Sequence, residues 1–252
     1  PAYTAWWQKD SKLSAPLNSN LKTVMDFSFF DKINTAKNEQ TETWFKGLDR
    51  VYNNFVYDFL YPDPTSVLAF IENHDTDRFL GEGDNLPMLK QASTLLLTTR
   101  RIPQLYYGTE IMMNGVKSKS DGYVRKDFPG GWSDDKANAL TAAGRTKLQN
   151  ECYNFYKTLL NWRKGNEVIA KGNMTQFMVQ HGVYAYARQY NGKTVFVMLN
   201  GTDEATTLPL KYYKEILKDH AQGKDILTGR IINLDGELTM SPRESLVIEI
   251  FP

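Results

Sequence analysis

The stretch "SVLAFIENHDTDRFL", residues 66–80, decides the fold because an apolar run ends abruptly in a polar cluster. Residues 66–71 are typical of a buried strand, and Asn73, His74 and Asp75 follow closely. The chain has three histidines and one cysteine, so a His-Asp pair at the end of a strand needs an explanation. In sheets of parallel strands, ligands bind beyond the carboxyl ends of the strands. These residues are therefore candidates for a functional site.

Strand-like and helix-like segments alternate on both sides of this stretch. The expected strands are residues 21–30, 66–71 and 102–113, and the expected helices are residues 41–60, 85–100 and 141–164. Pro87 fits the second helix because a proline is tolerated in the first turn. Strands that alternate with helices form parallel sheets covered by those helices. The first two thirds of the chain are therefore predicted to be α/β.

After Gly165 the pattern changes to strand-like runs separated by turn dipeptides. The dipeptides are Asn191-Gly192, Thr228-Gly229 and Asp235-Gly236. An Asn-Gly pair between two such runs is a strong hairpin signal because both residues accept positive φ. We therefore predict an α/β domain over residues 1–168 and an antiparallel β-sandwich domain over residues 169–252.

The composition is that of a globular protein without a strong charge bias. Of the 252 residues, 41% are hydrophobic and 23% are charged, and the formal net charge is +1. No Lys/Arg-rich run is interleaved with aromatic residues, so nucleic acid is not an expected partner. No apolar run approaches the roughly 20 residues of a membrane span. Cys152 lies in the pattern of an amphipathic helix and is expected to fill space in the core.

Carboxylates and an imidazole at strand ends suit the binding of a sugar. His74 and Asp75 follow the second expected strand, and Asp26 and Glu110 hold looser versions of this position in the other two. A carboxylate beside a neutral donor can bind vicinal hydroxyls, and further carboxylates can stabilise developing positive charge. The cleavage of a glycosidic bond needs both.

Simpler structural roles account for the same residues. Asp75 and Asp77 can cap the segment that follows, and Asp77 with Arg78 can form a surface ion pair of small energetic effect. "NHDTD" also looks like a set of oxygen ligands, but it lacks the glycine turn and distal Glu of a calcium loop, so no metal site is predicted. These residues alone leave the choice between a cap and a site open.

Three motifs in order, followed by a β domain, resemble the α-amylase family of glycoside hydrolases. They are "FIENHDTDR" (70–78), "IPQLYYGTE" (102–110) and "DGYVRKDFPGGW" (121–132). Within that family the chain looks most like the neopullulanase and cyclomaltodextrinase branch. The resemblance implies that residues 1–168 are the C-terminal part of a (β/α)8 barrel, about strands six to eight with their helices.

The resemblance also implies roles for the residues after the second strand. Asp75 matches the third catalytic carboxylate of the family, and His74 matches the histidine that binds hydroxyls of the sugar being cleaved. Asn73 belongs to the same motif and is expected to bind substrate. In this family the matching Asp favours the oxocarbenium-like transition state and neither attacks nor donates a proton.

Further substrate-binding positions follow from the same resemblance. Asp121 and Arg125, four residues apart, match an Asp and an Arg that bind a glucose further along the non-reducing side. Arg78 is also assigned to substrate binding. Arg101 stands where most members of the family have Gly before Ile-Pro, a departure that affects the local turn.

The other two catalytic carboxylates of the family, a nucleophilic Asp and an acid/base Glu, have no match in the chain. No Arg-x-Asp triplet lies in an apolar strand, and about three βα units precede the β domain where a barrel has eight. We therefore expect the C-terminal portion of a retaining hydrolase that cleaves α-1,4-glucosidic bonds in maltodextrins, cyclodextrins or pullulan. Alone, this portion is expected to be inactive.

The alternatives are an α-amylase or a transglycosylase of the same family, or a non-catalytic carbohydrate-binding relative. The expected partner is an α-glucan oligosaccharide. No cofactor is expected in this portion, whereas the resemblance allows calcium and a homodimer in the full-length enzyme. It implies a periplasmic location, with the cytoplasm as the alternative.

Overall fold

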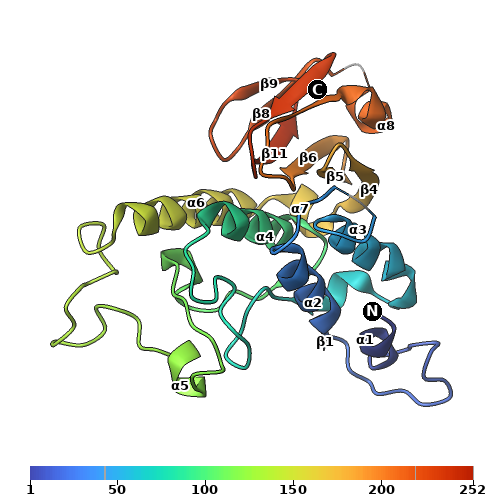
Figure 1. Cartoon of the computed structure of the whole chain (residues 1–252). Helices are drawn as coiled ribbons and strands as arrows, with labels where there is room; N and C mark the ends of the chain where they lie inside the picture. Colours follow the sequence, from blue (N-terminus) through green and yellow to red (C-terminus); the bar gives the residue numbers. More distant parts are fainter. Residues whose placement is uncertain (43, 219, 252) are drawn as a thin grey trace.

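The computed structural model describes residues 1–42, 44–218 and 220–251, and its chain forms two parts (Figure 1). The first part holds three short parallel strands in the order β1 (Val24–Met25), β2 (Val67–Ala69) and β3 (Ile102–Pro103). Its helices are α1 (Ala2–Trp6), α2 (Phe27–Ala36), α3 (Asp49–Val56), η1 (Tyr57–Leu60), η2 (Pro64–Ser66), α4 (Leu86–Thr98), η3 (Thr109–Ile111), α5 (Asp121–Val124), α6 (Lys147–Arg163) and α7 (Glu167–Lys171). None of the helices described is long and apolar enough to cross a membrane.

The parallel strands are shorter than the sequence indicates. Residues 21–30 are predicted as a strand, but only β1 is extended and α2 begins at Phe27. Asp26 causes this change because its side chain accepts a hydrogen bond from the Phe29 N–H (3.0 Å) and so caps the helix. The strand predicted over 102–113 likewise ends early, and Gly108, with a φ of 82°, introduces η3.

Two of the three helix predictions hold. The helix expected over 85–100 is α4, and Pro87 lies in its first turn as predicted. The helix expected over 141–164 is α6, which begins later because Thr146 forms a capping box at its start.

The helix predicted over 41–60 is wrong in its first half. A loop precedes α3, and Phe45 (φ 62°) and Gly47 (φ 54°) adopt left-handed backbone conformations in it. Residue 43 lies outside the described part of this range. The apolar spacing that suggested a long helix therefore covers a loop, α3 and the 3-10 turn η1.

The second part is the predicted antiparallel β domain. Its larger sheet has the order β4-β5-β6-β11-β8-β9, and its smaller sheet pairs β10 with β7. Asn191 (φ 48°) and Gly192 (φ 72°) form the tight turn between β5 and β6, so the hairpin prediction is confirmed. The elements are β4 (Asn173–Gln180), β5 (Val183–Tyr190), β6 (Lys193–Asn200), β7 (Thr206–Pro209), η4 (Leu210–Tyr213), α8 (Lys214–Leu217), β8 (Gln222–Asp225), β9 (Ile231–Asn233), β10 (Glu237–Met240) and β11 (Ser245–Ile250).

Helix α4 is the centre of a core that the two parts share. Eleven of its 13 residues are buried, and it packs against α6 and β11 (Figure 1). Gln91 Nε2 donates to the Asn200 carbonyl (2.6 Å), and Arg188 donates to the Thr98 carbonyl (2.8 Å). Cys152 lies in the same core, as predicted, and burial raises the pKa of its thiol to about 12. The two parts therefore pack as one unit.

Arg101 is the centre of a buried ionic network beside the parallel sheet. Its side chain is fully buried and contacts Asp26 (3.1 Å) and both carboxylate oxygens of Asp58. Arg100 binds Asp58 as well (2.6 Å). Burial by itself lowers the pKa of Arg101, but the two carboxylates raise it overall. Asp26 is thus a helix cap and ion-pair partner and is not accessible at the strand end.

The opposite face of the parallel sheet is open. Met25, Leu68 and Ile102 are register partners in neighbouring strands and therefore share this face. Met25 and Ile102 are exposed although both are apolar. In a closed barrel, side chains on this face fill the interior. The three strands thus present the kind of surface that further strands cover in a barrel.

We predict that Arg101→Met destabilises the fold by about 3–5 kcal/mol, because it leaves Asp26 and Asp58 buried without this cation. The control is Arg230→Met, because Arg230 is exposed and pairs with Glu244 at 2.9 Å; its expected effect is below about 1 kcal/mol. Urea unfolding of both variants measures the difference. Equal losses of stability would contradict a structural role for the network.

Candidate functional site

The polar residues after β2 form a loop whose backbone is held by its own side chains. Asn73 Oδ1 accepts a hydrogen bond from the Asp75 N–H (2.8 Å), and Thr76 Oγ1 accepts one from the Asn73 N–H (2.9 Å). Asn73 is buried, so its amide shapes the loop. The side chains of His74 and Asp75 are 60% and 61% exposed. The loop therefore presents these two groups to solvent.

A buried ion pair anchors this loop from below. Glu72 and Arg78 are 2% and 0% exposed, and Arg78 Nη1 lies 3.3 Å from Glu72 Oε1. Glu72 also accepts hydrogen bonds from the Phe79 N–H and the Thr109 hydroxyl. Burial raises the pKa of Glu72, and these donors oppose the shift. The pair closes the loop because its two members stand at the loop's two ends.

Arg78 also connects the loop to the segments that follow β3. Its guanidinium donates to the carbonyls of Tyr107 (2.6 Å) and Val124 (3.0 Å). The alternative of a surface ion pair with Asp77 does not hold, because Arg78 turns into the interior. A side chain without exposed surface cannot contact a sugar, so the assignment of Arg78 to substrate binding is not kept. Arg78 is instead a positioning residue. Its partner Glu72 has the same role, and the sequence pattern did not single it out.

Four of the predicted site residues meet on the surface above this anchor. Arg125 Nε donates to the His74 carbonyl (2.8 Å), and Arg125 Nη2 lies 3.0 Å from Asp75 Oδ1 and 3.1 Å from Asp121 Oδ2. His74 Nε2 lies 3.1 Å from Asp75 Oδ2. We call these four residues the Asp75 cluster. The fold brings them together from the loop after β2 and from α5 with its C-terminal end, about 50 residues apart in the chain.

The Asp75 cluster suits a ligand that carries hydroxyl groups. Asp75 directs one oxygen to Arg125 and the other to His74, and a carboxylate has further lone pairs for hydroxyl donors. Ion pairs this exposed contribute at most about 1 kcal/mol to stability, so the fold does not depend on them. Among the residues that the structure describes, no group of three or more His, Cys, Asp or Glu side chains is placed to hold a metal ion.

The sequence is similar to cyclomaltodextrin glucanotransferases and an alpha-amylase over most of its length. Residues 174–249 match the model of the cyclo-malto-dextrinase C-terminal domain. The chain is 30% identical over 217 residues to a cyclomaltodextrin glucanotransferase of Thermoanaerobacterium thermosulfurigenes. The aligned region covers 83% of this chain and 28% of that protein. It is 28% identical over 220 residues to an alpha-amylase of Niallia circulans, which covers 84% of this chain and 38% of that protein.

Solved structures show the same fold at lower sequence identity. An alpha-amylase from Geobacillus thermoleovorans, complexed with acarbose, superposes with a TM-score of 0.73 at 20% identity and covers 93% of this chain and 49% of that chain. The cyclomaltodextrin glucanotransferase CldA has a TM-score of 0.72 at 22% identity and covers 98% and 46%. The chain thus spans between about a quarter and a half of the length of these proteins.

We predict that Glu72→Ala destabilises the protein by about 3–5 kcal/mol, because it leaves the guanidinium of Arg78 buried without its carboxylate. Glu82→Ala, which removes an exposed partner of Lys119, is the matched control and is expected to cost less than about 1 kcal/mol. Chemical denaturation gives the two values. Hydrogen exchange at the amides of residues 73–78 should accelerate in the first variant alone; unchanged exchange there would contradict the anchoring role.

Proposed function

Because the chain is related in sequence and fold to the α-amylase family, we propose that it carries one part of the active site of an α-glucan-degrading glycoside hydrolase. The observation that supports this most is the Asp75 cluster, which lies beyond the carboxyl ends of β2 and β3. In barrels of strands and helices, catalytic groups come from the loops at this end.

In this proposal Asp75 acts on the ring that is cleaved. Its carboxylate accepts hydrogen bonds from the 2- and 3-hydroxyls, and these bonds strengthen as the ring flattens towards the oxocarbenium-like transition state. His74 contributes its imidazole to the same sugar. Asp121 and Arg125 bind a glucose further along the non-reducing side, and Arg125 also holds Asp75 in place through their contact at 3.0 Å.

The nucleophile and the acid/base belong, in this proposal, to segments of the protein outside the chain. Retaining glycosidases need two carboxyl groups about 5 Å apart on either side of the scissile bond. The carboxylates around Asp75 have other partners: Glu72 is buried against Arg78, Asp77 accepts a hydrogen bond from the Lys117 N–H, and Asp121 binds Arg125 and Lys117. The open face of the three-stranded sheet supports further strands, since a closed barrel has eight.

The proposed reaction is hydrolysis of α-1,4 links in maltodextrins, cyclodextrins or pullulan, as in neopullulanases. A second candidate is glycosyl transfer, which the names of several relatives favour because they are cyclomaltodextrin glucanotransferases. The two reactions share the transition state that Asp75 stabilises and differ in whether water or a sugar hydroxyl accepts the glycosyl group. Residues of the Asp75 cluster therefore serve either reaction.

We predict that the purified 252-residue chain releases no reducing sugar from maltodextrin, cyclodextrin or pullulan, whereas the intact protein does. The reason is that Asp75 cannot form or break a glycosidic bond without the nucleophile and the acid/base. Reducing-sugar assays with chromatography of the products measure both proteins, and panose from pullulan identifies a neopullulanase-like specificity. Sugar release by the chain alone would refute the proposed division of the active site. An intact protein without activity on any α-glucan would refute the proposed function.

A further inference from the structure

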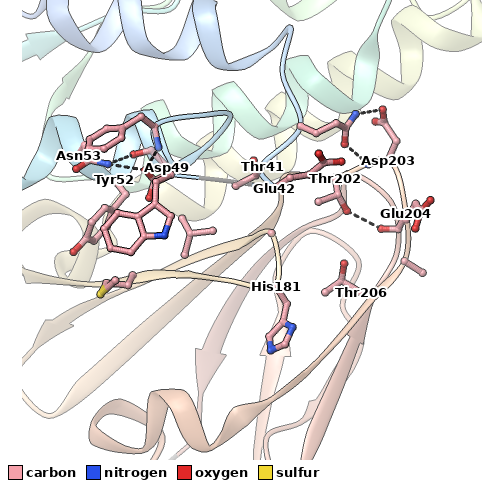
Figure 2. Close-up of a pocket in the computed structure, with 17 residues that line it drawn as sticks. Thr41, Glu42, Asp49, Tyr52, Asn53, His181, Thr202, Asp203, Glu204 and Thr206 are labelled. Carbon is pink, nitrogen blue, oxygen red and sulfur yellow. Dashed lines mark hydrogen bonds between the residues drawn. The ribbon is translucent and has the colours of Figure 1, made fainter.

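A second cleft lies where the two parts of the chain meet, away from the Asp75 cluster. It encloses about 720 Å³ between the loop that leads into α3, the turn between β4 and β5, and the loop between β6 and β7. Figure 2 shows Asp49, Tyr52 and Asn53 on one side and Asp203 and Glu204 on the other. None of its lining residues belongs to the Asp75 cluster, and α3 and α5 stand on opposite sides of the molecule in Figure 1.

The cleft displays aromatic side chains that the fold does not bury. Trp44 is 76% exposed and Phe45 is 60% exposed, although large aromatic residues usually lose most of their surface on folding. Phe45 has a φ of 62°, a conformation that a bulky residue rarely adopts. Its N–H donates to Asp49 Oδ2 (2.6 Å), which holds the loop in this form. Strained backbone of this kind concentrates at binding sites.

Hydrogen bonds and close backbone packing join the walls of the cleft. Thr41 N–H donates to the Gly201 carbonyl (3.0 Å), and the two backbones approach so closely that a Cβ at Gly201 would lie 2.0 Å from the Thr41 hydroxyl. The Gln40 side chain binds Asp203 twice, as a donor to its carboxylate and as an acceptor from its N–H (3.0 Å). A preformed cleft of this size is typical of small-molecule sites.

Four carboxylates line the cleft, those of Glu42, Asp49, Asp203 and Glu204, and their charges disfavour an anionic ligand. Asp49 accepts hydrogen bonds from Phe45 and Asn53. Asp203 binds Arg243 at 2.6 Å, and this hydrogen bond lowers the pKa of the Asp203 carboxyl. Asp49 and Asp203 thus have internal partners, and Glu42 and Glu204 are exposed in the cleft. Amide, hydroxyl and carboxylate oxygens that surround an exposed indole match a sugar, which offers hydroxyls at its edge and C–H groups on its face.

We propose that this cleft is a second carbohydrate-binding site, which takes a segment of neutral α-glucan with one glucose ring stacked on Trp44. The choice of α-glucan rests on the proposed function, whereas the choice of a sugar rests on the cleft itself. The site holds a long glucan on the surface, so that its benefit grows with chain length. Short substrates that reach only the Asp75 cluster gain nothing from it.

Binding of maltoheptaose to the intact protein tests the proposal. The measurements start from an Asp75→Asn/Arg125→Ala variant, in which the Asp75 cluster is disabled and the cleft is unchanged. Adding Trp44→Ala is expected to weaken calorimetric binding of maltoheptaose at least tenfold, which corresponds to about 1.4 kcal/mol. The matched control adds Phe59→Ala, because Phe59 is also 76% exposed and lies outside the cleft; its expected effect is less than about twofold.

Two results would overturn the proposal: the Asp75→Asn/Arg125→Ala variant binds no maltoheptaose, or Trp44→Ala binds it as tightly as that variant does. Equal thermal midpoints of the Trp44 and Phe59 variants exclude unfolding as the cause of a loss, and cellohexaose tests the preference for α-linked glucose. If binding depends on Trp44 but the intact protein without substitutions has no activity on any α-glucan, the proposed function is refuted and the carbohydrate site in the cleft is supported. If that protein is fully active but binding does not depend on Trp44, the carbohydrate site is refuted and the proposed function is supported.

Discussion

The buried ion pair of Glu72 and Arg78 is the interaction on which the candidate active site depends. It closes the loop after β2, and through the two carbonyls that Arg78 binds it fixes the segments after β3 and at α5. Asp75 and Arg125 are exposed and make only surface contacts, so they cannot order these segments themselves. A buried ion pair is a poor source of stability compared with apolar packing. Its value here is that it holds separate loops in one arrangement.

Polar contacts also join separate segments of the chain at two other places in the molecule. Arg101 and its carboxylate partners lie beside the parallel sheet and join the start of α2 to the turn after α3. At the junction of the two parts, Gln40 and Thr41 bind the loop after β6. At the loop after β2 and at the junction of the two parts, a few buried or closely packed polar contacts set the position of a surface on which exposed groups can meet a ligand. The Asp75 cluster and the second cleft are the two surfaces that result.

The sequence predicts the elements whose cause is local. The Asn191-Gly192 hairpin and helix α4 follow from turn chemistry and apolar spacing, and the polar loop after β2 follows from an abrupt change of composition. The partner of Arg78 was not predictable in this way, because Asp77 is its neighbour in sequence and only the fold turns the side chain inward. The apolar spacing around Phe45 predicts a helix, whereas Phe45 has a left-handed backbone conformation that this spacing does not reveal. The second cleft joins residues more than 150 positions apart, beyond the range of any sequence pattern.

The central claim is that Asp75 is a functional carboxylate and that its neighbours serve to place it. The most direct test is the kcat of Asp75→Asn in the intact protein, on the α-glucan that it degrades fastest. Asp77→Asn is the control, because Asp77 is an exposed carboxylate of the same loop that accepts a hydrogen bond from the Lys117 N–H (2.6 Å). The account predicts a fall of at least about 10²–10³-fold for Asp75→Asn and less than about threefold for Asp77→Asn. Near-normal turnover of Asp75→Asn in a folded protein would contradict it.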